Sequence, residues 1–434
     1  MGSGDIKDIY RKDLTEDFPD QLTIRLGETE LRYEKRLFTL PGEDGRPVKS
    51  GLRYGENPGQ PAALYRLVNG NLALSGLEFV GPGQGLVSDI GATGQDLVFG
   101  CRKHPSKTNL TDVDSALGIL RYLTDSPTAV IVKHNNPSGA AADDSLASAF
   151  HKAFEADRVA AFGGALVVNR ALDRATASSM VERYMEVVAA PDFEEGVVEI
   201  LSKKPDLRIF RLPKIERLSE FRYQRFLDIK SLIDGGLVLQ HSAVSRVQAP
   251  GDFRPATADR AGERLESARP PSEAERRDLL FGWAIEQGVV SNSVLFVKDR
   301  VTVGIGCGQQ DRVGVVEVAI FKARRNYAEH LAFSNHGLTF PELSRAARLG
   351  SKPNEAVSDI EAQVDEACGN LRGSVMVSDA FFPFRDAVDL AIGQGVTAIA
   401  HPGGSLRDFE SLQAANLASP PVAMVFTGQR AFKH

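Results

Sequence analysis

Residues 129–141, AVIVKHNNPSGAA, place a lysine and a histidine directly after four apolar residues. Histidine can take up or release a proton near neutral pH, and an ammonium group can stabilise a developing negative charge. Taken alone, such a pair is more often a surface lysine beside a capping histidine. The NNPSG stretch predicts a tight turn fixed by Pro137 and Gly139, and this favours a functional role for Lys133 and His134.

Three further segments carry side chains suited to binding. In GLRYGENPGQP (51–61) the composition is typical of a turn, but Arg53 can grip a phosphate with two hydrogen bonds and Tyr54 offers a ring and a hydroxyl. SDAFFPFRD (378–386) surrounds a proline with phenylalanines, which indicates either core packing or a pocket that stacks a planar heterocycle. Asn292, in SNSVLF, is either a turn residue or an amide that hydrogen-bonds a carbonyl or carboxamide.

The segment GIGCGQQDRV (304–313) is glycine-rich and precedes a predicted helix, so backbone N–H groups there could face an anion. It matches neither GxGxxG nor a P-loop, which makes it a weak signal. Cys307 lies in this segment without an evident basic partner, and we expect it to be a packed residue rather than a nucleophile.

Composition excludes several classes of protein. The chain has 434 residues, a formal charge of −6 and a pI of about 5.9, which argues against a general nucleic-acid binder. Its three cysteines are widely spaced, and neither CxxC nor HxE…PCxxC occurs, so we expect no disulfide framework and no zinc site. No long apolar run and no apolar leader are evident, which predicts a cytoplasmic protein without a membrane span.

Short apolar runs alternate with helical patterns along the chain. Strands are expected at 129–132, 164–169, 186–191, 207–213, 374–380, 396–401 and 422–426. Ser272 and Glu275 predict a helix start by a capping box, 293–306 predicts a hairpin with an Asp299-Arg300 turn, and a long helix should cover 311–332. The predicted class is α/β, in two lobes that are each built on a mixed sheet.

Polar residues follow four of the predicted strands, at the edge of an α/β sheet where ligands bind: Lys133 to Asn136, Asp379, His401 to Ser405, and Thr427 to Arg430. Residues 242–271 are polar and proline-rich, and we interpret them as a surface crossover. The expected organisation is therefore an N-terminal extension (1–50), a first lobe (51–241), the crossover (242–271) and a second lobe (272–434).

Nine segments, taken together, resemble the formyltransferase part of the bifunctional purine-biosynthesis family, 5-aminoimidazole-4-carboxamide ribonucleotide (AICAR) transformylase. They are RYGENPGQ, KHNNPSGAA, AFGGALVVNRALD, EVVAAPDF, SNSVLF, GIGCGQQDRV, SDAFFPFRD, HPGGS and GQRAFKH, in the family's order over residues 51–434. In that family a cyclohydrolase domain precedes the transformylase, whereas only about 50 residues precede RYGENPGQ here. We therefore expect a monofunctional chain that works with a separate IMP cyclohydrolase.

The resemblance implies transfer of a formyl group from 10-formyltetrahydrofolate, as co-substrate, to the 5-amino group of AICAR in IMP biosynthesis. It also implies two lobes similar to cytidine deaminase without the zinc, and a homodimer. The acidic charge and the lack of a long apolar run predict no nucleic-acid or membrane partner. A bound monovalent cation is left open.

The resemblance also assigns residues. His134 is the expected general base, Lys133 the group that stabilises the oxyanion or protonates N10, and Asn292 the residue that orients the formyl group or the carboxamide. The expected nucleotide-binding residues are Arg53, Tyr54, Gly163, Glu186, Phe381, Arg430 and Phe432. The expected folate-binding residues are Phe384, Asp386, Pro383 and Ser405.

Two alternatives stay open at this stage. The first is formylation of AICAR with ATP and formate, which the absence of a GxxxxGK[ST] pattern weakens. The second is a non-catalytic protein that binds purine intermediates, which the presence of both Lys133 and His134 argues against.

Overall fold

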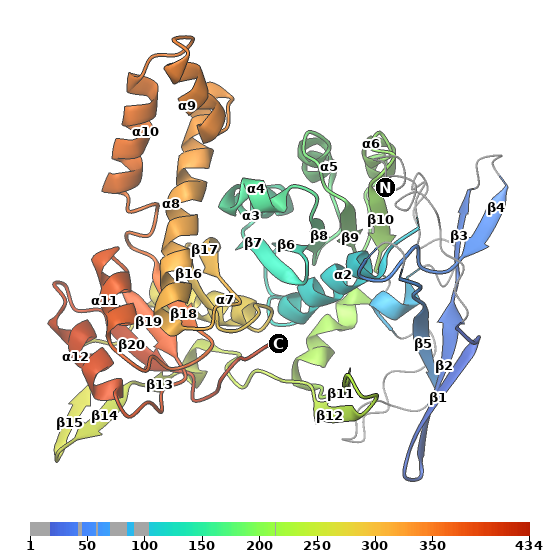
Figure 1. Ribbon diagram of the computed structural model, residues 1–434, viewed down its shortest axis with the longest axis horizontal. Helices are drawn as coiled ribbons and strands as arrows, with labels where there is room; N and C mark the ends of the chain where they lie inside the picture. Colours follow the sequence, from blue (N-terminus) through green and yellow to red (C-terminus); the bar gives the residue numbers. More distant parts are fainter. Residues whose placement is uncertain (1–17, 42–45, 58–59, 70–84, 91–103, 213) are drawn as a thin grey trace. The chain divides into compact units, whose positions relative to one another are not determined.

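The computed structural model describes residues 18–41, 46–57, 60–69, 85–90, 104–212 and 214–434, and it has a mixed α/β fold (Figure 1). The described residues form two compact units. Unit 1 contains the described residues up to Pro127, together with Val132–Asn135 and Gly163–Val244; unit 2 contains Thr128–Ile131, Asn136–Phe162 and Ser245–His434. The division passes through strand β6 (Thr128–Lys133).

Unit 1 contains a parallel sheet whose strands are β8 (Ala165–Val168), β9 (Val187–Ala190) and β10 (Arg208–Arg211). β8 and β9 are apolar and fully buried along their whole length, as is typical of parallel strands covered on both faces. Helices of this unit are α2 (Lys107–Leu120), α5 (Arg174–Val181) and α6 (Val197–Leu201). α2 begins at a capping box formed by Ser106 and Asn109.

Several antiparallel strands of unit 1 were not predicted from the sequence. One sheet pairs β1 (Gln21–Leu26), β2 (Thr29–Arg36) and β5 (Leu64–Asn69). Two hairpins pair β3 (Phe38–Pro41) with β4 (Pro47–Ser50), and β11 (Leu227–Ser231) with β12 (Leu237–His241). 3-10 turns lie at Val87–Asp89 and Ile215–Tyr223. β1, QLTIRL, alternates polar and apolar residues, so the sequence carries a strand signal there that was overlooked, whereas β3 and β4 have only four residues each.

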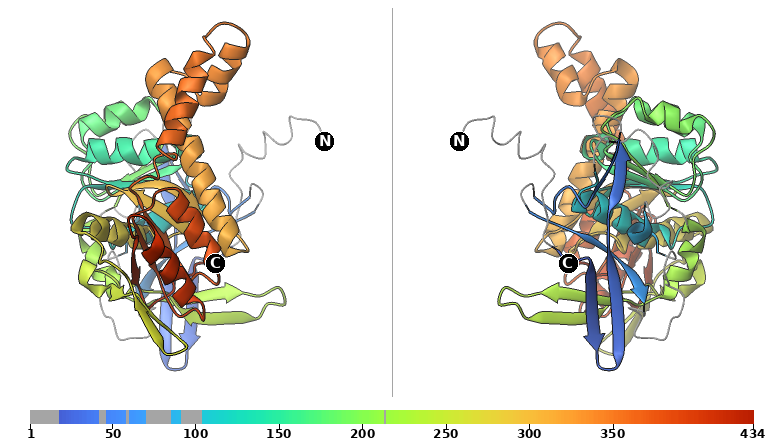
Figure 2. Two further views of the ribbon diagram at one scale, coloured as in Figure 1. Left: turned by 90° about the vertical axis from the view of Figure 1, so that its left-hand side faces the viewer. Right: turned by 90° about the vertical axis from the view of Figure 1, so that its right-hand side faces the viewer.

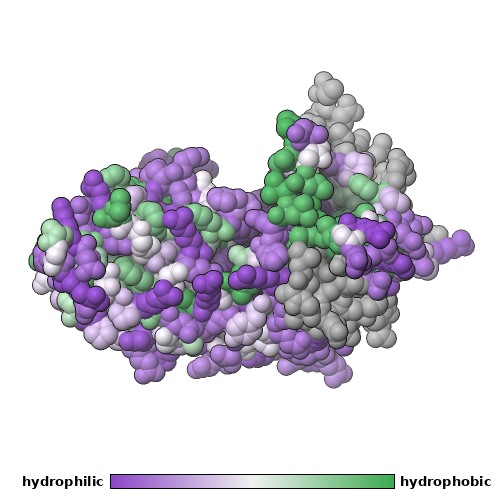
Figure 3. Space-filling view, turned by 90° about the horizontal axis from the view of Figure 1, so that it is seen from below, coloured by the Kyte–Doolittle hydropathy of each residue, from purple (hydrophilic) through white to green (hydrophobic). Residues whose placement is uncertain are grey.

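The β11–β12 hairpin exposes an unusual number of apolar side chains. It projects from unit 1 in both side views (Figure 2), and apolar surface gathers there in the view from below (Figure 3). The exposed apolar residues of the hairpin are Ile229, Leu232, Ile233, Leu237, Val238 and Leu239. Contiguous apolar surface of this kind commonly marks an interaction site.

Unit 2 is built on a mixed sheet with the strand order β7-β17-β16-β18-β19-β20-β13. The pairs from β7 (Asn136–Ala142) through β17 (Val301–Gly306) and β16 (Val294–Lys298) to β18 (Val375–Ser378) are antiparallel. β18, β19 (Ala398–His401) and β20 (Ala423–Phe426) are parallel, and β13 (Arg254–Pro255) is antiparallel to β20. The predicted Asp299-Arg300 turn between β16 and β17 is confirmed.

Two helices cover the opposite faces of this sheet, because successive side chains of a strand point to opposite sides. Leu295 and Val297 lie against Gly282 of α7 (Glu273–Glu286). Val294 and Phe296 belong instead to a buried cluster that contains Val315 and Ala319 of α8 (Arg312–His336). α7 begins at the predicted Ser272/Glu275 capping box.

The other elements of unit 2 lie around this core. They are α3 (Leu146–Ala156), α4 (Arg158–Ala161), α9 (Phe340–Arg348), α10 (Glu355–Glu366), α11 (Asp386–Gly393), α12 (Asp408–Leu417), the β14 (Thr257–Arg260)–β15 (Glu263–Glu266) hairpin and a 3-10 turn at Pro250–Asp252. The β14–β15 hairpin lies within 242–271, where we had predicted little regular structure, and its mostly exposed residues explain why. Within the described ranges, no helix is long and apolar enough to cross a membrane.

A helix–hairpin–helix arrangement occurs twice along the chain, as α2-β6-β7-α3 and as α7-β16-β17-α8. In each copy a glycine of the second strand lets the following helix approach closely. A Cβ on Gly139 would lie 2.1 Å from the carbonyl oxygen of Ala153, and one on Gly304 would lie 2.4 Å from that of Ala319. Glycine is required at both positions because the obstructing atoms are backbone atoms.

We predict that Gly304→Ala lowers the free energy of unfolding by about 1–3 kcal/mol, because α8 must move away from β17 to accept the methyl group. Gly118→Ala is the matched control. A Cβ there meets nothing within 4 Å, and alanine is favoured over glycine in a helix interior, so stability should rise by roughly 1 kcal/mol. Thermal unfolding of both variants measures whether each substitution lowers or raises stability. An unchanged unfolding midpoint for Gly304→Ala would contradict the packing described above.

Candidate active site

The turn after β6 presents the two residues predicted to do chemistry. β6 is buried from Ala129 to Val132, whereas Lys133 is half-buried and His134 is exposed. His134 and Asn135 adopt a left-handed backbone conformation, with φ angles of 55° and 62°. The expectation that Pro137 and Gly139 form the tight turn is therefore wrong, because both lie within β7.

A carboxylate on α2 explains how two non-glycine residues hold this backbone conformation. The N–H of Asn135 donates a hydrogen bond of 2.7 Å to Oδ1 of Asp112, and the N–H of His134 is bonded to the same side chain. Burial raises the pKa of Asp112, while these two N–H groups and the charge of His134 act in the opposite direction. Asp112 thus stabilises the turn and adds an acidic group beside His134.

Arg53 and Tyr54 are held against the beginning of the same helix. The N–H of Arg53 donates to the carbonyl of Pro105 at 3.0 Å, and the carbonyl of Tyr54 accepts from the N–H of Lys107 at 3.0 Å. The Arg53 guanidinium lies 5.4 Å from the centre of the Tyr54 ring. α2 therefore carries both the Arg53-Tyr54 segment and, through Asp112, the Lys133-His134 turn.

Gly163 and Glu186, two of the expected nucleotide-binding residues, lie near each other in unit 1. Gly163 has a φ of 75° and donates from its N–H to the carbonyl of Tyr184 at 2.8 Å. Glu186 follows at the start of β9, lies 3.8 Å from the guanidinium of Arg208, and its charge acts on Asp112. Glu186 is thus connected electrostatically to Asp112, the carboxylate that holds the His134-Asn135 turn.

In unit 2, Asn292 has its amide orientation fixed by an arginine that sequence reasoning missed. Nη2 of Arg312 donates to Oδ1 of Asn292 at 2.8 Å, and Nη1 of Arg312 binds Asp379 and the Ser378 hydroxyl. A guanidinium has only donors, so the Asn292 oxygen must face it. The amide nitrogen of Asn292 is then the group available to donate to a ligand.

Glu286 lies beneath this network and is completely buried. The Ser293 hydroxyl donates to its Oε1 at 3.0 Å, while its Oε2 has no hydrogen-bond partner among the described residues. Burial, followed by the nearby charge of Asp379, raises the pKa of Glu286 well above its ordinary value. The buried position therefore favours the neutral form of the Glu286 carboxyl.

The other nucleotide-binding candidates of unit 2 form a cluster at the C-terminal segment. The guanidinium of Arg430 lies 5.1 Å from the centre of the Phe381 ring and 5.5 Å from that of Phe432. The N–H of Ala431 donates to the carbonyl of Asp379 at 3.0 Å. This bond connects the cluster to the network around Arg312.

The four folate-binding candidates lie at the beginnings of α11 and α12. Phe384 is half-exposed, with the Arg407 guanidinium 4.7 Å from its ring centre, and Pro383 and Asp386 are exposed beside it. Ser405 donates from its N–H to the Asp408 carboxylate at 3.0 Å and accepts at its hydroxyl from the Arg407 N–H at 3.1 Å. Arg407 thus connects Phe384 with Ser405.

His401, one of the polar residues expected at strand ends, has a structural role. It is fully buried between the rings of Phe382 and Phe426, and its Nδ1 accepts from the Gly403 N–H at 3.1 Å. Burial lowers the pKa of His401 to about 3, so the ring is neutral.

Two functional candidates, Asp112 and Arg312, were missed by the sequence analysis. Neither stands at a predicted strand end, and both act through partners about 20 residues or more distant in sequence. Among the described residues, no group of three or more His, Cys, Asp or Glu side chains could hold a metal ion. Gly59 of the RYGENPGQ segment and Cys101 lie outside the described residues.

We predict that Glu286→Gln changes the pH dependence of stability. The pKa of Glu286 is raised in the folded chain, whereas its ordinary pKa is 4.5. As the pH rises above 4.5, the unfolded state therefore releases a proton that the native state still binds. Wild-type stability contributed by this group is therefore lost as pH rises, by up to about 1.4 kcal/mol per pH unit. Urea unfolding between pH 5 and 8 should show the variant gaining on the wild type; a difference that is constant with pH would contradict a protonated Glu286.

Comparison with known proteins identifies the family. The family model of the AICARFT/IMPCHase bienzyme matches residues 44–322. The bifunctional purine biosynthesis protein PurH of Sorangium cellulosum is 37% identical over 406 residues, which cover 92% of this chain and 60% of that protein. The PurH protein of Caldicellulosiruptor saccharolyticus is 34% identical over 383 residues, which cover 88% and 59% respectively. The chain thus spans about 60% of the length of these relatives. It belongs to the AICARFT/IMPCHase bienzyme family.

Proposed function

We propose that this chain is an AICAR formyltransferase that moves the formyl group of 10-formyltetrahydrofolate to the 5-amino group of AICAR, giving FAICAR in IMP biosynthesis. One observation carries the proposal. Asp112 of α2 holds the turn that presents Lys133 and His134, and Arg53 and Tyr54 lie against the beginning of the same helix. Membership of the family supports the same reaction.

The accepting amine is a poor nucleophile, because its lone pair is delocalised into the imidazole ring and toward the carboxamide. In the proposed reaction the amine nitrogen attacks the formyl carbon and His134 takes the proton that it loses. Lys133 stabilises the oxyanion that forms on the formyl oxygen. The carbon–N10 bond then breaks, N10 takes a proton, and tetrahydrofolate leaves.

Asn292 is proposed to donate a hydrogen bond from its amide nitrogen to the formyl oxygen or to the carboxamide oxygen. Its side-chain oxygen accepts from Arg312, which supports a donor role toward the ligand. Arg312 is proposed as the residue that positions Asn292, and it is itself held by Asp379 and Ser378.

The remaining assignments follow the resemblance. Arg53 and Tyr54 are proposed to bind the phosphate end of the nucleotide. Gly163, Glu186, Phe381, Arg430 and Phe432 are proposed to complete the nucleotide site, and Phe384, Asp386, Pro383 and Ser405 to bind the folate. The half-exposed ring of Phe384 and the exposed carboxylate of Asp386 support contact with a pterin.

The proposal extends to architecture and partners. We propose that the two lobes, with the boundaries 51–241 and 272–434 on either side of the 242–271 crossover, resemble cytidine deaminase without its zinc. A cytoplasmic homodimer is proposed, and the exposed apolar side chains of β11–β12 support association. An IMP cyclohydrolase is proposed to close the ring after the transfer.

The direct test is incubation of the chain with AICAR and 10-formyltetrahydrofolate, with FAICAR and IMP followed separately. FAICAR should accumulate and IMP should not. If product formed only with formate and ATP, formate would be the formyl donor in place of 10-formyltetrahydrofolate. Tight binding of AICAR without transfer from either donor would establish a binding protein instead.

We predict that Lys133→Ala and His134→Ala each leave the affinity for AICAR nearly unchanged and lower kcat by at least ~10²-fold, the usual effect of losing a general base or acid. Titration calorimetry and the formyl-transfer assay measure the two quantities. A variant that loses binding and retains turnover at saturation would contradict the assigned roles.

We predict that Asp112→Ala lowers kcat at least ~10-fold with little change in KM for AICAR, because the N–H groups of the turn lose their acceptor. Asp112→Asn keeps an acceptor oxygen and should restore part of the activity, while it shifts the pH–rate profile by removing the charge beside His134. Asp114→Ala, at an exposed position on the same helix, is the control. If Asp112→Asn and Asp112→Ala were equally impaired with the wild-type profile, the positioning role would be wrong.

A further inference from the structure

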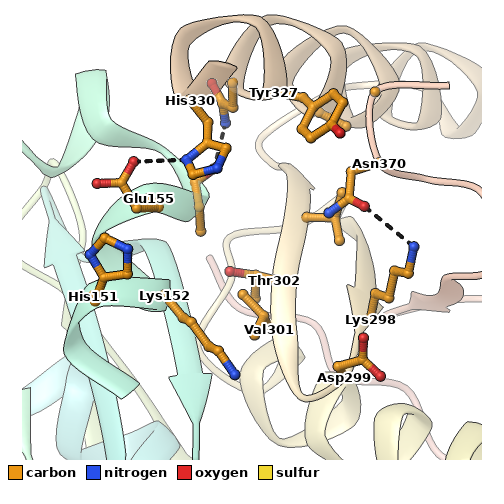
Figure 4. Close-up of a pocket in the computed structure, with 15 residues that line it drawn as sticks. His151, Lys152, Glu155, Lys298, Asp299, Val301, Thr302, Tyr327, His330 and Asn370 are labelled. Atoms are coloured by element: carbon orange, nitrogen blue, oxygen red, sulfur yellow. Dashed lines mark hydrogen bonds and ion pairs between the residues drawn. The ribbon is translucent and has the colours of Figure 1, made fainter. Parts of the chain in front are cut away.

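Unit 2 contains a cavity of about 440 Å³ whose lining includes none of the candidate catalytic, nucleotide-binding or folate-binding residues (Figure 4). Its walls come from α3, the β16–β17 hairpin, α8 and the segment at Gly369-Asn370. The volume is within the range of small-molecule sites, which are largely apolar with a few convergent polar groups. The polar residues that the argument uses are Lys152, Glu155, Lys298, Asp299, Tyr327 and Asn370.

Two lysines reach the cavity from different walls (Figure 4). Lys152, from α3, pairs with Asp143 at 2.7 Å. Lys298, from the end of β16, donates to Oδ1 of Asn370 at 3.3 Å and to the carbonyl of Arg372 at 3.0 Å. Because the Asn370 oxygen accepts from an ammonium, its amide nitrogen is oriented to donate.

The carboxylate that faces these groups is already neutralised. Glu155 accepts from Arg158 at 2.5 Å and lies 3.1 Å from Nδ1 of His330. Burial alone would raise its pKa, but hydrogen bonds from His330 and Arg158 and the charges of Arg158 and His151 hold the pKa of Glu155 at about 2. Asp299 is the other acidic residue of the lining, and it is exposed at the rim.

The position of Lys298 in the fold repeats that of Lys133. Each lysine ends a strand, and each is followed by two left-handed residues: His134 and Asn135 have φ angles of 55° and 62°, and Asp299 and Arg300 have φ angles of 54° and 57°. Asp278 of α7 accepts from the N–H groups of Asp299 and Arg300 at 2.9 and 2.7 Å, as Asp112 of α2 does in the first copy. The second copy therefore presents an ammonium group by the same device, with an aspartate where the first has the histidine.

We propose that this cavity binds a small organic phosphate. The phosphate lies between the ammonium groups of Lys152 and Lys298 and accepts from the amide nitrogen of Asn370, since a dianion with several acceptor oxygens suits two point charges and a neutral donor. The organic part packs on Val301, Val303, Ala323 and the ring of Tyr327. The inference does not depend on the proposed formyl transfer.

The test is equilibrium dialysis of the full chain with ribose 5-phosphate. The double variant Lys152→Met/Lys298→Met should bind one ribose 5-phosphate fewer per chain than the wild type. The matched control Lys203→Met/Lys204→Met removes the same charge at two exposed positions and should bind as the wild type does. Equal stoichiometry and affinity in all three chains would overturn the proposal.

Two further measurements test whether Asn370 contacts the phosphate and whether the cavity prefers a phosphate to a dicarboxylate. Asn370→Asp preserves the shape of the side chain, and aspartate tolerates the left-handed φ of 69° at that position. This variant should weaken binding at the cavity at least ~10-fold by placing a carboxylate against the phosphate. Succinate binding as tightly as ribose 5-phosphate to the wild-type cavity would contradict a phosphate site. The stoichiometric readout is unaffected if the chain lacks formyltransferase activity.

Discussion

A buried carboxylate that accepts backbone N–H groups from a left-handed turn is the interaction on which the proposed site depends. Two consecutive non-glycine residues in this conformation are costly unless their surroundings stabilise them. Asp112 provides that stabilisation for His134 and Asn135. It does so from α2, a helix whose first turn also holds Arg53 and Tyr54, so one rigid element fixes the proposed base and the proposed phosphate ligands together.

The same device occurs twice, with similar backbone conformations and different side chains. Asp278 holds the Asp299-Arg300 turn as Asp112 holds the His134-Asn135 turn. Each copy also needs a glycine, Gly139 or Gly304, where the following helix approaches its strand. Both copies thus share the aspartate and the glycine that the backbone conformation requires. The side chains presented to a ligand differ between the copies, and in this way one fold can carry different sites.

The sequence predicted the elements with strong local signals. The buried strands β6, β8 and β18, the capping box of α7, the β16–β17 turn and the long helix α8 all lie close to where apolar runs and caps indicated. The exposed hairpins β11–β12 and β14–β15 were missed, because few of their side chains are buried and the alternation in β11, LDIKS, is brief. The NNPSG stretch was misinterpreted. Gly139 allows α3 to pack closely against β7, and the left-handed turn lies at His134 and Asn135, before Pro137.

Side-chain roles that depend on distant partners were beyond sequence reasoning. Nothing local marks Asp112 or Arg312, and the raised pKa of Glu286 follows from complete burial. Conversely, His401 had the residue type and position of a site residue, yet two aromatic rings enclose it. Residue type at a strand end therefore predicts where chemistry lies, whereas hydrogen-bond partners decide which residues perform it.

The most direct test of the central claim is a crystal structure of the chain with AICAR bound. The account predicts the 5-amino nitrogen within about 3.2 Å of a ring nitrogen of His134, the reach of a proton transfer, with the phosphate on Arg53. An amino group that lies remote from His134 and Lys133, with the phosphate bound elsewhere, would contradict it.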